Sequence, residues 1–367
     1  MNNSNKEKYF GISIKFWKET KSLLILIVIL FTIKATIVEA YIVPTGSMEN
    51  TILTGDMLVG NKFVYGMRTP PWIGLPYTRI GFEIPFTRLP KFKEVESGDV
   101  TIFEFPRDPF QKYVKRCIGT PGDEITLLNG ILHVNDKLME FPIEGKHTQE
   151  ILNSGTFQKE LHPIFIGNKD NIPLFTVPQK GTAITFSPET YLPMIDDMEV
   201  DWESIITLLV QDGNDVELAG YRFVVEDPQE IGRTYGMIKF KILSLFQSDS
   251  KQKEQKSRRK YVQELINNNN INKLANPWFF PNYGRYMSVN SISSENIYRS
   301  ITLNGTPVSS VENYKLMHDY FFFMGDNRDN SYDSRFWGFV PDYQILGTPL
   351  VSIINFFNFT LRLKTII

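Results

Sequence analysis

The chain has 367 residues but few cysteines, few histidines and almost no net charge. Its single cysteine, Cys117, excludes an internal disulfide bond. The four histidines show no H-x-x-x-H or H-E-x-x-H spacing, so no zinc site is expected. A formal net charge of -2 provides no basic excess to neutralise phosphates. The composition therefore argues against a nucleic-acid partner.

Long apolar runs are also scarce, and the main one lies near the N-terminus. Residues 22–33 are twelve residues without a charge, after a lysine-rich tail at 1–21 and before Lys34. A spanning helix needs about 20 residues, but Lys34 can snorkel to an interface and Tyr41 suits the far headgroup region. We predict one transmembrane helix over 22–40 with a cytoplasmic N-terminus. The alternative is a cleavable signal peptide, although no clear small-x-small cleavage site follows.

The rest of the chain has the composition of a mostly β protein. Val, Ile, Thr and Phe are frequent, together with 24 Gly and 21 Pro. Apolar alternation and turn residues predict strands at 57–65, 100–105 and 111–118. The apolar stretch 350–361 is too short to span a membrane and is predicted to be a buried strand.

A serine stands directly after the predicted membrane segment, in the stretch Ile-Val-Pro-Thr-Gly-Ser-Met-Glu-Asn at 42–50. Ser47 lies between Gly46 and Met48 and is a candidate nucleophile at the outer surface of a membrane. A serine hydroxyl is a weak nucleophile until a nearby base activates it. The remaining chain must therefore supply that base.

A lysine in the predicted strand 111–118 is the best candidate. Side chains alternate along a strand, so Tyr113, Lys115 and Cys117 share one face. A lysine on such a face is partly desolvated, which lowers its pKa from about 10.4. A neutral lysine can take a proton from a serine hydroxyl. The alternative is that Lys115 only decorates a solvated edge.

A polar stretch at 325–335 follows an apolar strand that ends at Met324. Its density of Asp, Asn, Ser and Arg predicts a rigid hydrogen-bonded turn. Two charge pairs are expected within it, Asp326 with Arg328 and Asp333 with Arg335. The alternative is an elaborate surface turn without a function.

Together these stretches resemble the bacterial type I signal peptidases, which are membrane-bound Ser/Lys endopeptidases. The likeness covers about a third of the chain, at residues 22–65, 97–135 and 319–347. It is carried by Pro-Thr-Gly-Ser-Met at 44–48, by Tyr-Val-Lys-Arg at 113–116 with Gly-Thr-Pro-Gly-Asp at 119–123, and by Gly-Asp-Asn-Arg-Asp-Asn-Ser-Tyr-Asp-Ser-Arg-Phe-Trp-Gly at 325–338.

The resemblance implies a catalytic role for four residues. Ser47 corresponds to the nucleophile and Lys115 to the general base. The Thr45 hydroxyl would join the Ser47 backbone N–H in the oxyanion hole; threonine stands here where serine is common, and its hydroxyl can donate the same bond. Ser331 corresponds to the residue that orients the lysine amine.

It also implies supporting roles around the site. Asp333 and Arg335 match a structural acidic–basic pair. Met48 and Tyr113 correspond to positions that place the substrate. No metal or organic cofactor is implied.

The domain organisation follows from the same likeness. We expect a signal-peptidase-like Ser/Lys protease β-fold in two parts, 41–135 and 319–367, with an inserted accessory β-rich region at 136–318. Within the insertion, 172–186 is predicted to form strands around a turn and 201–210 a short helix. Residues 247–276 are predicted to be an exposed, partly helical or flexible excursion.

The implied function is cleavage of signal peptides from exported preproteins at the outer face of the cytoplasmic membrane, with preproteins and the lipid bilayer as partners. One alternative is a catalytically silent, membrane-tethered homologue that acts as a binding or scaffold protein. A self-cleaving Ser/Lys repressor would need an N-terminal DNA-binding domain, which residues 1–43 do not provide. A serine–histidine enzyme would have to pair Ser331 with His318, which lies in no local motif.

Overall fold

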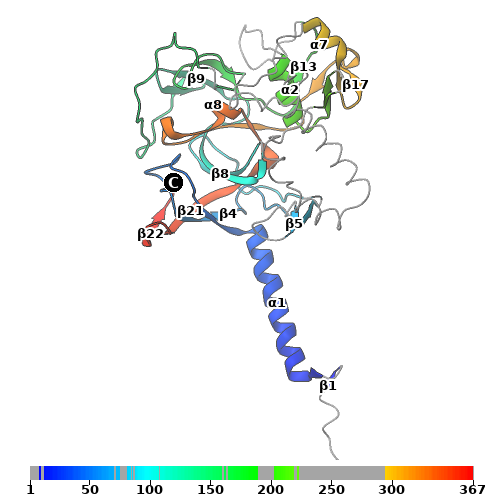
Figure 1. Ribbon diagram of the computed structural model, residues 1–367, viewed down its shortest axis with the longest axis vertical. Coiled ribbons are helices and arrows are strands. Elements are labelled where there is room, and N and C mark those ends of the chain that lie inside the picture. Colours follow the sequence, from blue (N-terminus) through cyan, green and yellow to red (C-terminus); the bar gives the residue numbers. More distant parts are fainter. Residues whose placement is uncertain are drawn as a thin grey trace, which may run out of the picture.

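The computed structural model describes most of the chain. The described parts are residues 8–9, 12–69, 72–74, 81–83, 85, 87–106, 108–158, 161–162, 164–188, 202–218, 221–222 and 294–366. One long helix projects from a β-rich body, and helices α2 (Trp202–Gln211) and α7 (Ser294–Ser300) lie on the far side of that body (Figure 1). The predicted mostly β class is therefore confirmed. The predicted excursion at 247–276 lies outside the described residues.

The projecting helix differs from the predicted transmembrane segment. Helix α1 covers Ile14–Thr36, not 22–40, and follows a two-strand pairing of β1 (Lys8–Tyr9) with β2 (Ile12–Ser13). It ends there because the next residues form strand β3 (Val38–Ile42), which pairs with the main sheet. Its apolar run is only the twelve residues between Lys21 and Lys34. No helix in the described part of the chain is both long and apolar enough to cross a membrane.

The main sheet is antiparallel, has eight strands and is strongly curled (Figure 1). Its strand order is β20-β19-β8-β7-β21-β4-β3, and β22 also pairs with β21. The strands are β3, β4 (Asp56–Asn61), β7 (Val100–Phe105), β8 (Asp108–Gly119), β19 (Tyr320–Met324), β20 (Val340–Pro341), β21 (Ile345–Asn355) and β22 (Thr360–Thr365).

The sheet brings three distant stretches together. β8 has β7 on one side and β19 on the other. The lysine of β8, the turn that follows β19 and the loop between β3 and β4 therefore meet at one place. A separate small pairing joins β5 (Trp72–Gly74) to β6 (Gly81–Glu83).

The C-terminal stretch 350–361 is not the predicted buried strand. It contains the end of β21, a turn and the start of β22. The large side chains at the turn point to solvent, with Phe357 69% and Phe359 78% exposed. The asparagines that interrupt the apolar run make the turn, because Asn355 Oδ1 accepts hydrogen bonds from the backbone N–H groups of Phe357 and Asn358.

The described residues of the accessory region, together with the preceding residues 124–135, form two smaller four-stranded sheets, one two-stranded pairing and two helices. One sheet has the order β11-β10-β9-β12 and the other β15-β14-β16-β17. The elements are β9 (Glu124–Leu128), β10 (Ile131–Val134), β11 (Lys137–Leu138), β12 (Ile172–Thr176), β13 (Ala183–Ile184), α2 (Trp202–Gln211), β14 (Val216–Leu218), β15 (Tyr221–Arg222), α7 (Ser294–Ser300), β16 (Ile301–Leu303), β17 (Thr306–Pro307) and β18 (Tyr314–Lys315). The strands predicted at 172–186 and the helix predicted at 201–210 are confirmed.

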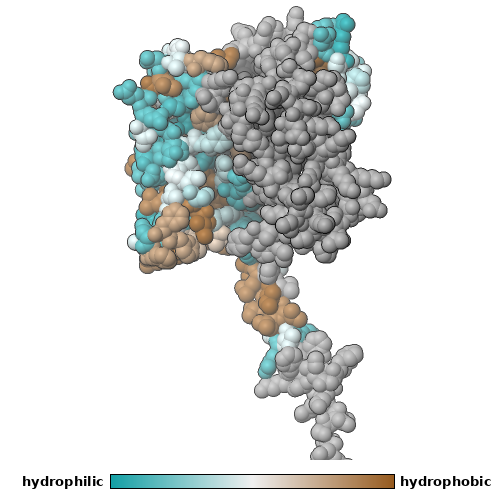
Figure 2. Space-filling model, viewed as in Figure 1, coloured by the Kyte–Doolittle hydropathy of each residue, from teal (hydrophilic) through white to brown (hydrophobic). Residues whose placement is uncertain are grey.

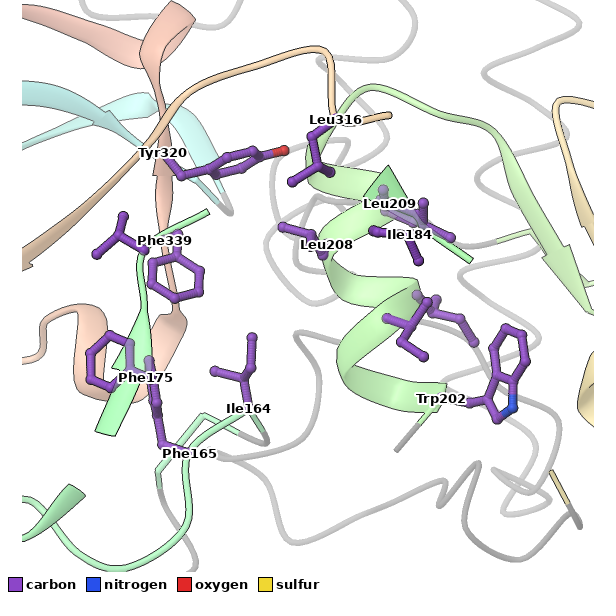
Figure 3. Close-up of a cluster of buried hydrophobic side chains, with 14 of the residues drawn as sticks. Ile164, Phe165, Phe175, Ile184, Trp202, Leu208, Leu209, Leu316, Tyr320 and Phe339 are labelled. Carbon is purple, nitrogen blue, oxygen red and sulfur yellow. The ribbon is translucent and has the colours of Figure 1, made fainter. Parts of the chain in front are cut away.

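The accessory region and the main sheet share one hydrophobic core. Side chains of α2, including Trp202 and Leu208, lie on one side of this core, and Phe165, Phe175 and Phe339 lie on the other (Figure 3). β19 also contributes to it through Tyr320 and Phe322. Burial of this continuous apolar surface holds the insertion against the sheet that carries the site. The predicted division at residues 135 and 318 stays a prediction.

Candidate active site

The loop between β3 and β4 presents Ser47 in a tight turn. The Glu49 N–H donates to the Gly46 carbonyl at 3.1 Å, which closes a turn with Ser47 and Met48 at its centre. Met48 is 1% exposed and packs with Ile52 and other residues in a small hydrophobic cluster. The resemblance implies that Met48 helps to position the substrate. In the structure, its buried side chain anchors the turn that carries Ser47. Ser47 itself is 7% exposed.

Lys115 reaches this serine from β8. Its amine donates a hydrogen bond to Ser47 Oγ, and its Nζ lies 5.5 Å from the centre of the Tyr113 ring. Tyr113 and Cys117 belong to one hydrophobic cluster, so the predicted shared face of the strand is confirmed. The lysine is 4% exposed.

The surroundings make the Lys115 amine unusually easy to deprotonate. Burial lowers its pKa from the ordinary 10.5 to about 8, because an ammonium loses its hydration there. The carboxylates of Asp333 and Asp326 oppose this shift, and the Arg335 guanidinium adds to it. A lysine in this state is a competent base near neutral pH.

Thr45 stands on the solvent side of the same turn. Its Oγ1 lies 3.5 Å from Ser47 Oγ, and the residue is exposed. Within the described part of the chain, the Ser47 backbone N–H donates no hydrogen bond. The Thr45 hydroxyl thus lies beside the nucleophile on the exposed side of the turn. Its predicted role in an oxyanion hole, together with the Ser47 N–H, stays a prediction.

The turn after β19 packs directly against the nucleophile loop. Gly325 stands at the contact: a Cβ there would lie 2.3 Å from Ser331 Oγ and 2.5 Å from the Ser47 carbonyl oxygen. Ser331 is 6% exposed, and its hydroxyl forms no hydrogen bond to Lys115 in the described part of the chain. The structure therefore places Ser331 beside Ser47, and its role as the orienter of the lysine remains a prediction.

Asp333 and Arg335 form a buried two-point ion pair. Arg335 Nε and Nη2 each lie 2.9 Å from one oxygen of the Asp333 carboxylate. The same carboxylate accepts the Gly325 N–H at 3.1 Å and precedes the short helix α8 (Ser334–Trp337). Burial raises the pKa of Asp333, but the adjacent guanidinium holds it below its ordinary value. Arg335 also donates to the carbonyl of Arg328 at 2.6 Å, so the pair fixes the turn from both ends.

The predicted pairing of Asp326 with Arg328 is wrong. Asp326 pairs instead with Arg116, whose Nε and Nη2 lie 2.9 and 2.8 Å from the two carboxylate oxygens. The register of β19 on β8 sets Met324 opposite Arg116 and so delivers Asp326 to that guanidinium. The Arg328 guanidinium lies over the Phe141 ring at 5.0 Å, and burial lowers its pKa to about 10.

Sequence reasoning missed two further residues at the site. Thr51 Oγ1 donates to Asp326 at 2.6 Å, which ties the nucleophile loop to the turn after β19. Asn327 donates hydrogen bonds from its backbone and its side chain to the turn that holds Ser47. Asn327 lies within the quoted motif, but no local signal indicates that its partner is the nucleophile loop.

The serine–histidine alternative finds no support in the geometry. His318 Nδ1 lies 2.9 Å from an oxygen of Asp342, and its ring packs edge-on against Tyr343. The hydrogen bond to the Asp342 carboxylate raises the pKa of His318, which lies just before β19. Neither contact involves Ser331.

One group of side chains in the described part of the chain has ligand atoms close enough for a metal ion. Atoms of His147, Asp170 and Asp329 lie within 4.8 Å of one another. The ammonium of Lys169 pairs with Asp329 and lies 3.5 Å from Asp170. A cationic side chain thus already contacts both carboxylates, and we assign no metal to this group.

Comparison with known proteins identifies the family of the chain. Residues 16–186 and 251–354 match the family described as "Signal peptidase, peptidase S26". A protein named Signal peptidase I from Rickettsia bellii is 34% identical over 133 residues, which are 36% of this chain and 44% of that protein. The protein of the same name from Rickettsia typhi is 33% identical over 184 residues, 44% of this chain and 66% of that protein. The match thus spans less than two thirds of the length of these relatives.

Proposed function

The chain belongs to the signal peptidase family, peptidase S26, and on that basis we propose that it removes signal peptides from exported preproteins as a Ser/Lys endopeptidase. Ser47 is the nucleophile and Lys115 the general base. The observation that carries this assignment is the hydrogen bond from the buried Lys115 amine to Ser47 Oγ. It supports a proton path between a nucleophile and a base of suitable pKa.

The reaction follows from these groups. Neutral Lys115 takes the proton of the Ser47 hydroxyl while Oγ attacks the scissile carbonyl carbon. The negative charge that develops on the carbonyl oxygen is met by the Ser47 N–H and the Thr45 hydroxyl. The Lys115 ammonium then protonates the leaving amine, and an acyl-enzyme remains. Lys115 next deprotonates a water molecule that hydrolyses this ester and returns the proton to Ser47 Oγ.

The state of Lys115 makes this cycle practicable. With a pKa of about 8, roughly a tenth of the amine is neutral at pH 7, whereas an ordinary lysine is almost wholly charged. The opposing carboxylates of Asp333 and Asp326 stop the pKa from falling further. Lys115 therefore also remains basic enough to hold the proton that it later gives to the leaving group.

We propose that Tyr113 and Met48 help to place the substrate at the nucleophile. Tyr113 lies beside the Lys115 amine, and the buried Met48 side chain holds the turn that presents Ser47. The resemblance implies small side chains, typically alanine, one and three residues before the scissile bond.

Exposed apolar side chains support action at a membrane. The turn joining β21 and β22 carries Phe357 and Phe359, and Leu361 follows in β22; these three side chains are 69–78% exposed. It lies on the side of the body from which α1 emerges, and Figure 2 shows brown surface there and on α1. We propose that α1 and this turn contact the lipid together and hold Ser47 near the bilayer surface. In this proposal the N-terminus is cytoplasmic and the catalytic part lies outside the cytoplasm.

The decisive experiment is cleavage of an authentic preprotein by the purified protein in detergent. Wild-type protein should cut at the signal junction, and Ser47→Ala and Lys115→Met should each abolish cutting without unfolding the chain. Full activity in either variant would refute the Ser/Lys assignment. Wild-type protein that binds the preprotein but never cuts it would instead favour a non-catalytic scaffold.

A further inference from the structure

Asn327 donates hydrogen bonds to the two peptide groups that flank Ser47. Its backbone N–H donates to the Ser47 carbonyl at 3.1 Å, and its side-chain Nδ2 donates to the Gly46 carbonyl at 3.0 Å. The same Nδ2 lies 3.3 Å from Glu49 Oε2. Asn327 is 2% exposed, so these bonds are shielded from water. A residue of the turn after β19 thus holds the turn that presents the nucleophile.

The bond to Gly46 matters because of the geometry of the peptide group. The Gly46 C=O and the Ser47 N–H belong to one planar unit and point in opposite directions. Fixing the carbonyl therefore fixes the direction of the N–H. A donor on the carbonyl also polarises the peptide and strengthens its N–H as a donor. The Ser47 N–H is the backbone donor of the proposed oxyanion site.

The orientation of the Asn327 amide is set by its neighbours. Both acceptors near Nδ2 are oxygens, so the reversed amide would place oxygen against oxygen. In the present orientation Oδ1 is buried without a hydrogen-bond partner. Burying an unpaired oxygen destabilises a fold. The amide is therefore held for its two donors at the expense of stability, which is typical of a functional residue.

We propose that Asn327 is a positioning residue that orients and polarises the Ser47 N–H for the oxyanion. This inference rests on the proposed Ser/Lys peptidase function and deepens it. Asn327 touches neither the substrate nor the reacting atoms. It acts through the Gly46–Ser47 peptide and should affect the transition state more than substrate binding.

The test compares Asn327→Ala and Asn327→Asp with the wild-type protein in detergent. Removing one oxyanion donor lowers kcat by about 100- to 1,000-fold. Loss of its orientation should lower kcat by a smaller factor, about 10- to 100-fold, with KM within about twofold. Asn327→Asp should lose more than Asn327→Ala, because a carboxylate oxygen would face the Gly46 carbonyl. The turn itself should survive, since the Glu49 N–H still holds that carbonyl.

Asn330→Ala is the matched control. Asn330 lies in the same turn, with its Nδ2 3.4 Å from the Cβ position of Gly46, and its side chain forms no hydrogen bond to the nucleophile loop in the described residues. It should keep the wild-type kcat. A second readout is the affinity for a substrate-derived peptide aldehyde, whose serine adduct carries the oxyanion, relative to the matching peptide alcohol. Asn327→Ala should weaken aldehyde binding selectively, whereas a purely structural defect would weaken both.

Two results would overturn the inference: a kcat unchanged in Asn327→Ala, or equal losses of aldehyde and alcohol binding. The Ser47 amide resonance in a serine-labelled NMR sample tests the inference without any catalysis. It should shift in Asn327→Ala and stay in place in Asn330→Ala, and an unchanged resonance in Asn327→Ala would also overturn the inference. If wild-type protein fails to cut preproteins while this shift appears, the proposed function fails and the positioning of Ser47 stands.

Discussion

Replacing Lys115 by methionine should abolish cleavage and at the same time make the protein more stable at neutral pH. Methionine fits a buried apolar site and has no charge to desolvate. The wild-type lysine is 4% exposed, and burial lowers its pKa from 10.5 to about 8. At pH 7 the folded protein therefore holds a charged amine in a place that disfavours it.

The shift in pKa sets the size of the effect. Since one pKa unit corresponds to about 1.4 kcal/mol, the folded state loses about 3 kcal/mol at pH 7 relative to an unperturbed lysine. The variant also gives up the hydrogen bond to Ser47, which is worth about 1 kcal/mol. We expect a net gain of about 2 kcal/mol in the free energy of unfolding.

The pH dependence identifies the cause. Between about pH 8 and 10.5 the unfolded wild-type chain binds more protons at Lys115 than the folded chain does, so wild-type stability rises with pH there. The stability difference between variant and wild type should be largest below pH 8 and should shrink towards pH 10.5. Other groups titrate equally in both proteins and cancel.

Urea unfolding in detergent at pH 7, 8.5 and 10 measures this difference, and preprotein cleavage measures activity. Below pH 8 the wild-type kcat/KM should fall about tenfold per pH unit, because the neutral amine is the active form. A variant that is less stable than wild type at pH 7, with a difference independent of pH, would refute the reasoning. Such a result would mean that nearby carboxylates fully stabilise a charged Lys115 ammonium, and that burial does not lower the pKa of this lysine.

Three further outcomes are expected. Thr45→Val should lower kcat by about 100-fold or more and Thr45→Ser should restore it, as a lost and regained oxyanion donor would; equal activity of both variants in preprotein cleavage would exclude the hydroxyl from the site. Gly325→Ala should lower kcat more than tenfold, because the new Cβ would lie 2.3 Å from Ser331 Oγ. A crystal structure of this variant should show the Ser47 loop and the turn after β19 displaced from each other. Unchanged activity would mean that the contact relaxes without cost. The double variant Phe357→Ser, Phe359→Ser should bind lipid vesicles several-fold more weakly in a flotation assay while its cleavage of a short soluble peptide stays normal; undiminished vesicle binding would remove this turn from the lipid contact.

The parts of the site that depend on local pattern were accessible from the sequence. Alternation along 111–118 placed Lys115 on the face of Tyr113 and Cys117, because side chains in any strand alternate. The density of Asp, Asn and Arg after Met324 predicted an ordered turn, since such side chains bond to nearby backbone. The family resemblance then singled out Ser47 as the partner of the lysine.

The ion-pair partner of Asp326 could not be predicted from the sequence. Arg328 lies two residues after Asp326, whereas Arg116 lies 210 residues before it, so sequence separation favoured Arg328. The register between β8 and β19 decided for Arg116, and register depends on the packing of whole strands. Likewise, only the fold shows that Asn327 reaches Gly46, 281 residues earlier in the chain.

The sequence by itself determined the candidate catalytic residues, the strand that carries Lys115 and the class of the protein. Tertiary structure decided where the first helix ends, that the phenylalanines near the C-terminus are exposed and which groups surround the nucleophile. The physical reason is the range of the forces involved. Strand alternation and turn chemistry act over a few residues. Burial, the pKa of Lys115 and the hydrogen bonds from Asn327 to the serine turn instead depend on segments that meet only in the folded sheet.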